Sequence, residues 1–153
     1  LELELEYDHQ YIVIAGRPAR GAGQTPLPGE DDLAAITAEV AAFPERFRRI
    51  KEGWLARLGA LRAGGKRTVV WGGGSKAVSF LTTLGLRDEV DFVVDINPHK
   101  HGKFVPGAGH AVMDPAVLRE KKPDCVVLMN PIYEQEVRAH LDGLGVHPEI
   151  LPV

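Results

Sequence analysis

Residues 72–77 combine a glycine-rich turn with a cation, which is a combination suited to binding a phosphate group. The pattern Gly72-x-Gly74-x-x-Ala77 fits the dinucleotide fingerprint G-x-G-x-x-G/A, and it follows four residues typical of a buried strand. A lysine in the first turn of the helix expected here, Lys76, costs about 0.3–1 kcal/mol unless an anion lies nearby. We therefore expect the loop amides and Lys76 to bind an anion. The alternative is a tight turn whose lysine only reaches into water.

Two further loops are expected at the same edge of the sheet. Asp95 follows Gly74 by 21 residues, at the end of a second expected strand, where a carboxylate can bind a ribose hydroxyl. In the third loop, Asn130 can cap a helix and Pro131 suits its first turn. Open α/β sheets bind ligands at the carboxyl ends of their strands, so we expect the three loops to meet at the ligand.

The second loop, residues 95–110, gathers hydrogen-bond donors and cations. Its three histidines, His99, His101 and His110, raise the alternative of a metal site, but they lack a liganding acid and helical spacing, so no metal is expected. An anion such as a diphosphate fits this loop better. His99 as a general base is a further alternative, although a histidine among lysines is more commonly a hydrogen-bond donor or a surface residue.

Short apolar segments alternating with helical patterns must position these loops. Strands are expected over residues 68–71, 92–96, 125–129 and 149–151, with helices over 76–84 and 133–144. This order predicts a small Rossmann-like α/β domain with a mostly parallel sheet, right-handed crossovers and flanking helices.

The N-terminal part has a different pattern. Residues 1–16 alternate leucine with glutamate, pause at Asp8-His9-Gln10 and resume, which predicts a β-hairpin, and residues 17–30 are a linker rich in Gly and Pro. In the remaining domain, 31–153, apolar residues recur every three or four positions from Leu33 to Leu61. This predicts one long amphipathic helix, or two stacked at a kink at Pro44. We expect its apolar stripe to pack on its own domain; an interdomain contact or a partner surface is the alternative.

Composition excludes several function classes. The 153 residues carry a net charge of −3, which argues against a general nucleic-acid binder. The single cysteine, Cys125, excludes an internal disulfide and a thiolate-based zinc site, and its apolar neighbours predict a buried strand thiol. No apolar run approaches the ~20 residues that span a bilayer, and no signal peptide is visible, so a cytoplasmic protein is expected. The chain lacks an initiator methionine and opens inside a pattern, so we expect it to be a piece of a longer protein.

Three segments together resemble a known family. "VVWGGGSKAVSFLTTLGL", "DFVVDINPHKHGKFVPGAGHAVMDPAVL" and "PDCVVLMNPIYEQEV" are similar to the C-terminal domain of the SAM-dependent sugar C-methyltransferases, with the string from Asp95 to Gly107 the most specific part. The resemblance covers roughly residues 30–153. The family's loop is commonly G-A-G-S-K-G, from which Gly73 and Ala77 depart, and Thr82 stands where asparagine is usual.

The resemblance implies a three-module enzyme of which this chain is the tail. A zinc-binding N-terminal module and a SAM-binding methyltransferase domain would precede it, and residues 1–16 resemble the last strand pair of that domain. This chain would then bind neither SAM nor zinc, and would be inactive alone. The family's C-terminal domain closes over the middle domain and helps to hold a nucleotide-diphosphate keto-sugar, while the middle domain supplies SAM and the base. Carried over, the candidate substrate contacts are Gly72, Gly73, Gly74, Ser75, Lys76, Asp95, Asn97, His99, Lys100, Lys103, Asn130 and Tyr133, and none is expected to be catalytic.

Two other function classes remain open from the residues alone. The first is an NAD-linked oxidoreductase fragment, although only about four parallel strands are visible and Lys76 is unusual inside that fingerprint. The second is a non-catalytic nucleotide-sugar sensor or an assembly module using the helix that bears Trp54. A sugar O-acyltransferase is remote, because no hexapeptide repeats follow.

Overall fold

The computed structural model describes residues 2–7, 10–18, 29 and 31–153. The chain divides into two compact units, Leu1–Arg46 and Phe47–Val153. Asp8 and His9 of the expected turn, and most of the expected linker, lie outside the described residues. No helix in the described ranges is long and apolar enough to cross a membrane.

The first unit begins with the expected hairpin. Strand β1 (Glu2–Glu6) pairs antiparallel with β2 (Tyr11–Ala15), and the register places Leu3 opposite Ile14 and Leu5 opposite Ile12. Because side chains alternate along a strand, these four apolar residues share one face of the hairpin.

Helix α1 (Leu33–Ala63) is a single helix that runs through Pro44, so the first of the two alternatives for this segment is correct. Its C-terminal part packs as expected: Leu58 is fully buried, and Trp54 and Leu61 pack against the core of the second unit. The expectation of packing on its own domain is wrong for the earlier part of the stripe, since its six large apolar residues are exposed: Leu33, Ile36, Val40, Phe43, Phe47 and Ile50.

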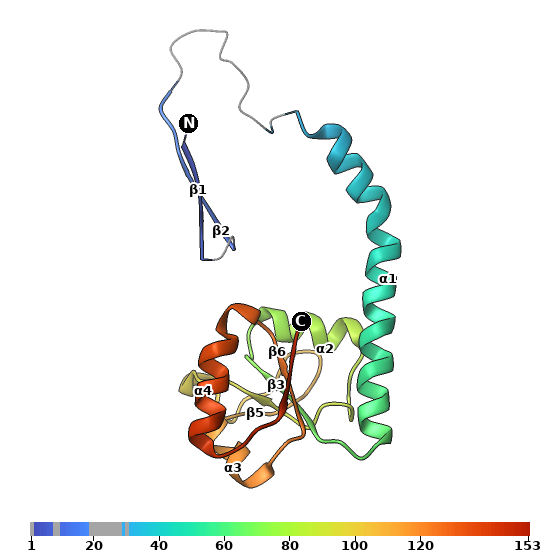
Figure 1. Cartoon of the computed structure of the whole chain (residues 1–153), viewed down its shortest axis with the longest axis vertical. Helices are drawn as coiled ribbons and strands as arrows, with labels where there is room; N and C mark the ends of the chain where they lie inside the picture. Colours follow the sequence, from blue (N-terminus) through green and yellow to red (C-terminus); the bar gives the residue numbers. More distant parts are fainter. Residues whose placement is uncertain (1, 8–9, 19–28, 30) are drawn as a thin grey trace. The chain divides into compact units, whose positions relative to one another are not determined.

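The second unit is a five-stranded parallel sheet between helices, which confirms the predicted α/β class (Figure 1). Its strands are β3 (Thr68–Trp71), β4 (Val93–Val94), β5 (Val112–Met113), β6 (Cys125–Leu128) and β7 (Glu149–Pro152), in the order β5-β4-β3-β6-β7. Each neighbouring pair is parallel. The chain therefore builds the sheet outward from β3 in one direction, then returns to the other side of β3 with β6.

Alternate side chains of β3 point into two apolar layers, one on each face of the sheet. Val70 belongs to the cluster formed with Ala77 and Leu81 of helix α2 (Ser75–Leu84). Val69 belongs to the cluster on the opposite face, which includes residues of helix α4 (Glu134–Leu144). Every residue of β3 and β6 is buried, as expected for strands covered on both faces.

Short elements account for the differences from the expected boundaries. Strand β4 is shorter than the predicted 92–96 because the chain turns at Asp95 into the 3₁₀ turn η1 (Pro98–Lys100). Helix α4 starts one residue later than the predicted 133, because the 3₁₀ turn η3 (Pro131–Tyr133) precedes it. Strand β5, the 3₁₀ turn η2 (Pro115–Val117) and helix α3 (Leu118–Lys121) were not predicted.

The segment before β5 folds back along the outer side of that strand. The amide of Gly102 donates to the carbonyl of Val112, and the amide of Val112 donates to the carbonyl of Lys103 (2.9 and 2.8 Å). An isolated antiparallel bridge joins Phe104 to Ala111. The side of β5 that faces away from β4 is thus covered by the loop that precedes this strand.

Candidate functional site

The glycine loop leaves β3 in a conformation that only glycine adopts easily. Gly72 has φ +102°, and its amide donates to the carbonyl of Val94 at 2.8 Å. Gly74 then takes the N-cap position of α2 with extended backbone, and no side chain caps the helix. The first backbone bond of the helix runs from Val78 to Gly74. The amides of Ser75 and Lys76 therefore start the helix without an acceptor from the preceding turn.

Lys76 and Asn130 link the loop after β3 with the loop after β6. The Lys76 ammonium donates to Oδ1 of Asn130 at 3.1 Å. The two strands are neighbours in the sheet, and a Cβ on Gly72 would lie 3.5 Å from Cβ of Met129. Because β3 is where the strand order reverses, these loops flank the topological switch point, where open α/β sheets bind ligands. Two of the predicted loops are thus in direct contact.

Asp95 lies at the end of β4 and fastens the third loop to the first. Its Oδ2 accepts from the Gly73 amide at 2.7 Å and from the Lys100 ammonium at 2.8 Å. Its Oδ1 accepts from the amide of Asn97 at 2.8 Å. The carboxylate is only 8% exposed, whereas the side chain of Lys100 is 37% exposed. Sequence reasoning placed Asp95 and Lys100 in the site but missed this ion pair between them.

The pKa of Asp95 lies below its usual value. Burial acts to raise this pKa, but the hydrogen bond from Lys100 and those from the amides of Asn97 and Gly73 together outweigh burial. Asp95 is therefore an ionised carboxylate that already accepts three hydrogen bonds.

The rest of the second loop is organised by local hydrogen bonds. Asn97 caps η1 by accepting from the amide of His99 at 3.0 Å, and the ring Nε2 of His101 lies 2.7 Å from the carbonyl of Asp95. A carbonyl can only accept, so this nitrogen carries the proton. His101 thus holds the start of the loop, a role that the sequence did not indicate.

The other predicted residues stay at the surface. Ser75, His99, Lys103 and Tyr133 are exposed. The histidines do not converge: His110 is buried elsewhere, with Nε2 2.8 Å from the carbonyl of Arg87. Among the described residues, no group of three His, Cys, Asp or Glu side chains has an arrangement that would hold a metal ion.

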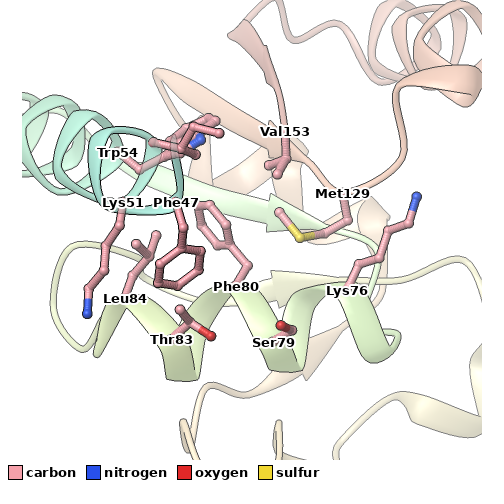
Figure 2. Close-up of a pocket in the computed structure, with 11 residues that line it drawn as sticks. Phe47, Lys51, Trp54, Lys76, Ser79, Phe80, Thr83, Leu84, Met129 and Val153 are labelled. Carbon is pink, nitrogen blue, oxygen red and sulfur yellow. The ribbon is translucent and has the colours of Figure 1, made fainter. Parts of the chain in front are cut away.

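An apolar groove of about 380 Å³ adjoins the glycine loop and was not foreseen from the sequence (Figure 2). Its walls are residues 47–54 of α1 and the face of α2 that starts at Lys76, with Met129 and Val153 at its end. Trp54 and Phe80 meet edge to face inside it, 5.2 Å between ring centroids. The helical spacing of Lys76, Phe80 and Thr83 indicated that these residues share one face of a helix. The sequence did not indicate which face of α1 would lie opposite them.

Residues 28–146 match the family described as "C-methyltransferase C-terminal domain". A search of curated proteins found no similar sequence. Similar solved structures include a Rex-family repressor, RSP, at 18% identity and TM-score 0.40, covering 57% of this chain and 52% of the repressor chain. Two further structures of RSP match over the same share of this chain: its complex with β-NADH (TM-score 0.40, 53% of that chain) and its complex with β-NAD⁺ and operator DNA (0.38, 49%). The chain thus spans about half the length of these repressor chains.

Proposed function

The chain belongs to the C-methyltransferase C-terminal domain family, and on this basis we propose that it is the substrate-clamping domain of a SAM-dependent C-methyltransferase. In this proposal the substrate is a nucleotide-diphosphate keto-sugar, and the domain that binds SAM precedes this one in a longer protein. Zinc belongs to a module further upstream. The part assigned to this chain is to bind the nucleotide-diphosphate end of the substrate.

The observation that carries the proposal is the pairing of free helix-start amides with a lysine at the switch point. The amides of Ser75 and Lys76 have no capping side chain, so the positive end of the α2 dipole is open. The Lys76 side chain is held at the neighbouring loop by Asn130. A diphosphate at this point would accept hydrogen bonds from the amides and offset the charge of the lysine.

The charge of Asp95 does not cancel this positive field, because it is matched within the loop. Lys100 and two backbone amides already engage the carboxylate. We therefore assign Asp95 the task of holding the first and second loops together, instead of the ribose contact expected from its position. His99 and Lys103 remain candidate contacts to the far end of the ligand, since both are exposed on the same loop.

The same field disfavours SAM as a ligand of this loop. The sulfonium of SAM is positively charged, and both the helix start and Lys76 would repel it. When bound by the preceding domain, SAM supplies the methyl group for a carbon next to the ketone. The residues of this chain would orient the sugar nucleotide and help to exclude water. Aligning two bound reactants contributes about 7–11 kcal/mol in favourable cases, so a domain that only positions the substrate would still matter for rate.

Calorimetry of the chain with UDP, dTDP, GDP, NAD and SAM tests the proposal. We expect binding of at least one nucleoside diphosphate, weakened by Lys76→Ala about tenfold or more, since hydrogen bonds to charged groups contribute roughly 1.5–3 kcal/mol. The loss should shrink at high salt. Lys121→Ala is the matched control: its carbonyl accepts from Arg67, just before β3, so it lies at the opposite edge of the sheet.

Each other result has a distinct meaning. Equal affinity of the Lys76→Ala variant and the parent chain at low salt would remove Lys76 from the site. Micromolar affinity for SAM would overturn the division of labour between the domains. Binding of NAD without any nucleoside diphosphate would favour the oxidoreductase alternative instead.

A further inference from the structure

The apolar groove beside the glycine loop is large enough to hold part of a small molecule. Its volume of about 380 Å³ lies within the range of roughly 300–1,000 Å³ that is usual for ligand pockets. All of its lining residues belong to the second compact unit, Phe47–Val153. A diphosphate at the start of α2 would leave this groove unfilled.

The groove begins at the place where the diphosphate is proposed to bind. Lys76 belongs to the first turn of α2 and also lines the groove. Met129 lines it as well, and its Cβ would lie 3.5 Å from a Cβ added to Gly72. From Lys76 the same face of α2 continues through Phe80 to Thr83, which extends it by about 10 Å (Figure 2). A ligand anchored by a diphosphate at the glycine loop would therefore carry its other end along this face.

The aromatic wall of the groove is held in place by contacts within the domain. Trp54 and Phe80 meet edge to face, and the guanidinium of Arg57 lies over the Trp54 ring, 5.9 Å from its centroid. Arg57 is in turn paired with Glu149 at 2.9 Å. Rings that are already fixed suit a flat aromatic ligand, because stacking uses the ring faces and a preformed site needs little ordering on binding.

The charges of the groove favour a ligand that is both aromatic and anionic. Among the described residues that line it, two are lysines, Lys51 and Lys76, and none is acidic. Ser79 and Thr83 add exposed hydroxyl groups along the α2 wall. A plain hydrocarbon offers these groups no hydrogen-bond partner, whereas a nucleotide joins a flat base to oxygen acceptors and a negatively charged end.

From the continuity of the groove with the glycine loop, its aromatic wall and its charges, we propose that it holds the nucleoside of the ligand. The diphosphate lies at the start of α2, and the base lies against Phe80 and Trp54. The inference rests on the function proposed above and adds that this chain recognises the aromatic end of the substrate as well as its charge. Affinity for a nucleoside diphosphate should therefore exceed affinity for inorganic pyrophosphate.

Calorimetry with UDP, dTDP and GDP, each compared with pyrophosphate, separates the two ends of the site. We expect at least one nucleoside diphosphate to bind about tenfold or more tightly than pyrophosphate, because stacking adds to the contacts of the diphosphate. Thr83→Glu should remove most of this advantage, since it places a carboxylate in the groove. Thr82→Glu is the matched control, because it adds the same charge in the same helical turn at an exposed position that does not line the groove. Both positions lie about 10 Å along the helix from Lys76, where salt screens the added charge, so affinity for pyrophosphate should change little in either variant.

The fluorescence of Trp54 gives a second readout that reports on the groove alone. Saturation with the nucleoside diphosphate that binds most tightly should change the indole emission, whereas saturation with pyrophosphate should not. The change should be lost in Trp54→Phe, which keeps the other tryptophan of the chain, Trp71.

Failure of this inference can be told apart from failure of the proposed function. If pyrophosphate and the nucleoside diphosphates bound equally well, and Lys76→Ala weakened both, the anion site would stand and the nucleoside subsite would be overturned. Equal effects of Thr83→Glu and Thr82→Glu on nucleoside diphosphate binding would also overturn it. Absence of binding by all four compounds would overturn both proposals. A dimer in sedimentation that Thr83→Glu dissociates would assign the groove to a second copy of the chain instead.

Discussion

Giving helix α2 a side-chain cap should make the domain more stable and its anion site weaker. Gly74 occupies the N-cap position with φ −95° and ψ −166°, the extended backbone that capping residues adopt. A Cβ added there would have no atom within 4 Å. An aspartate at this position therefore fits without strain, and its carboxylate can accept from the helix-start amides that now have no cap.

The size of the effect follows from comparing Gly74→Asp with Gly74→Ala, which share the loss of glycine flexibility in the unfolded chain. The aspartate variant adds a cap and a negative charge at the positive end of the helix dipole. Together these contribute about 1 kcal/mol relative to alanine, or about 4 °C in melting temperature for a domain of this size. The aspartate should also lower affinity for a nucleoside diphosphate about tenfold or more. Its carboxylate would occupy the amides that the diphosphate needs, and its negative charge would repel the diphosphate.

Thermal unfolding followed by circular dichroism and calorimetry of UDP binding would measure both effects. The alanine variant should keep diphosphate binding, because it blocks no amide. If the aspartate variant were no more stable than the alanine variant, the amides would not be available as described. A stable aspartate variant that bound the diphosphate as well as the parent would refute the placement of the ligand at this helix.

Two further predictions concern the neighbouring residues. Gly72→Ala should destabilise the domain by about 1–3 kcal/mol in urea unfolding, because Gly72 has φ +102°. Gly73→Ala should change the unfolding free energy by less than about 1 kcal/mol, since its Cβ would meet only ordinary contacts at 3.4–3.5 Å. Equal destabilisation by the two variants would contradict this account. Asp95 has a pKa lowered in the folded state, so its ionised form adds stability above about pH 4, the usual aspartate value, and that contribution is lost as pH falls through the lower folded pKa. The difference in unfolding free energy between the parent and Asp95→Asn should therefore shrink on acidification. A difference that stayed constant from neutral pH to well below about pH 4 would show that the ion pair with Lys100 adds no stability.

Elements with strong local signals were predictable from the sequence. Strand β3 was predicted with its observed bounds because four buried residues end abruptly at a glycine. Helix α2 was predicted to within one residue, and Gly85 ends it in the left-handed conformation that glycine adopts easily. The family resemblance is also confirmed by the match over residues 28–146.

What the sequence did not reveal depends on distant or very short pairings. Strand β5 has two residues, too few for any periodicity, and is defined by its pairing with β4. The ion pair between Asp95 and Lys100 needs the turn η1 to bring together two residues that extended chain would separate. The exposed half of α1 was expected to be packed, because helical spacing tells which residues share a face but not what lies opposite.

The two outer strands of the sheet bear on how this domain behaves at high concentration. An open outer strand is a template onto which another chain can add and start aggregation. On one side, the loop that folds back over β5 already takes up hydrogen-bonding groups of Val112, and the strand is only two residues long. On the other side, β7 is four residues long and ends in Pro152, which has no amide hydrogen to offer. Both outer strands of the sheet are therefore poor templates for strand-by-strand aggregation. Conditions that precipitate the protein should act through the exposed apolar residues of α1, such as Leu33, Ile36 and Val40, before they act through the sheet.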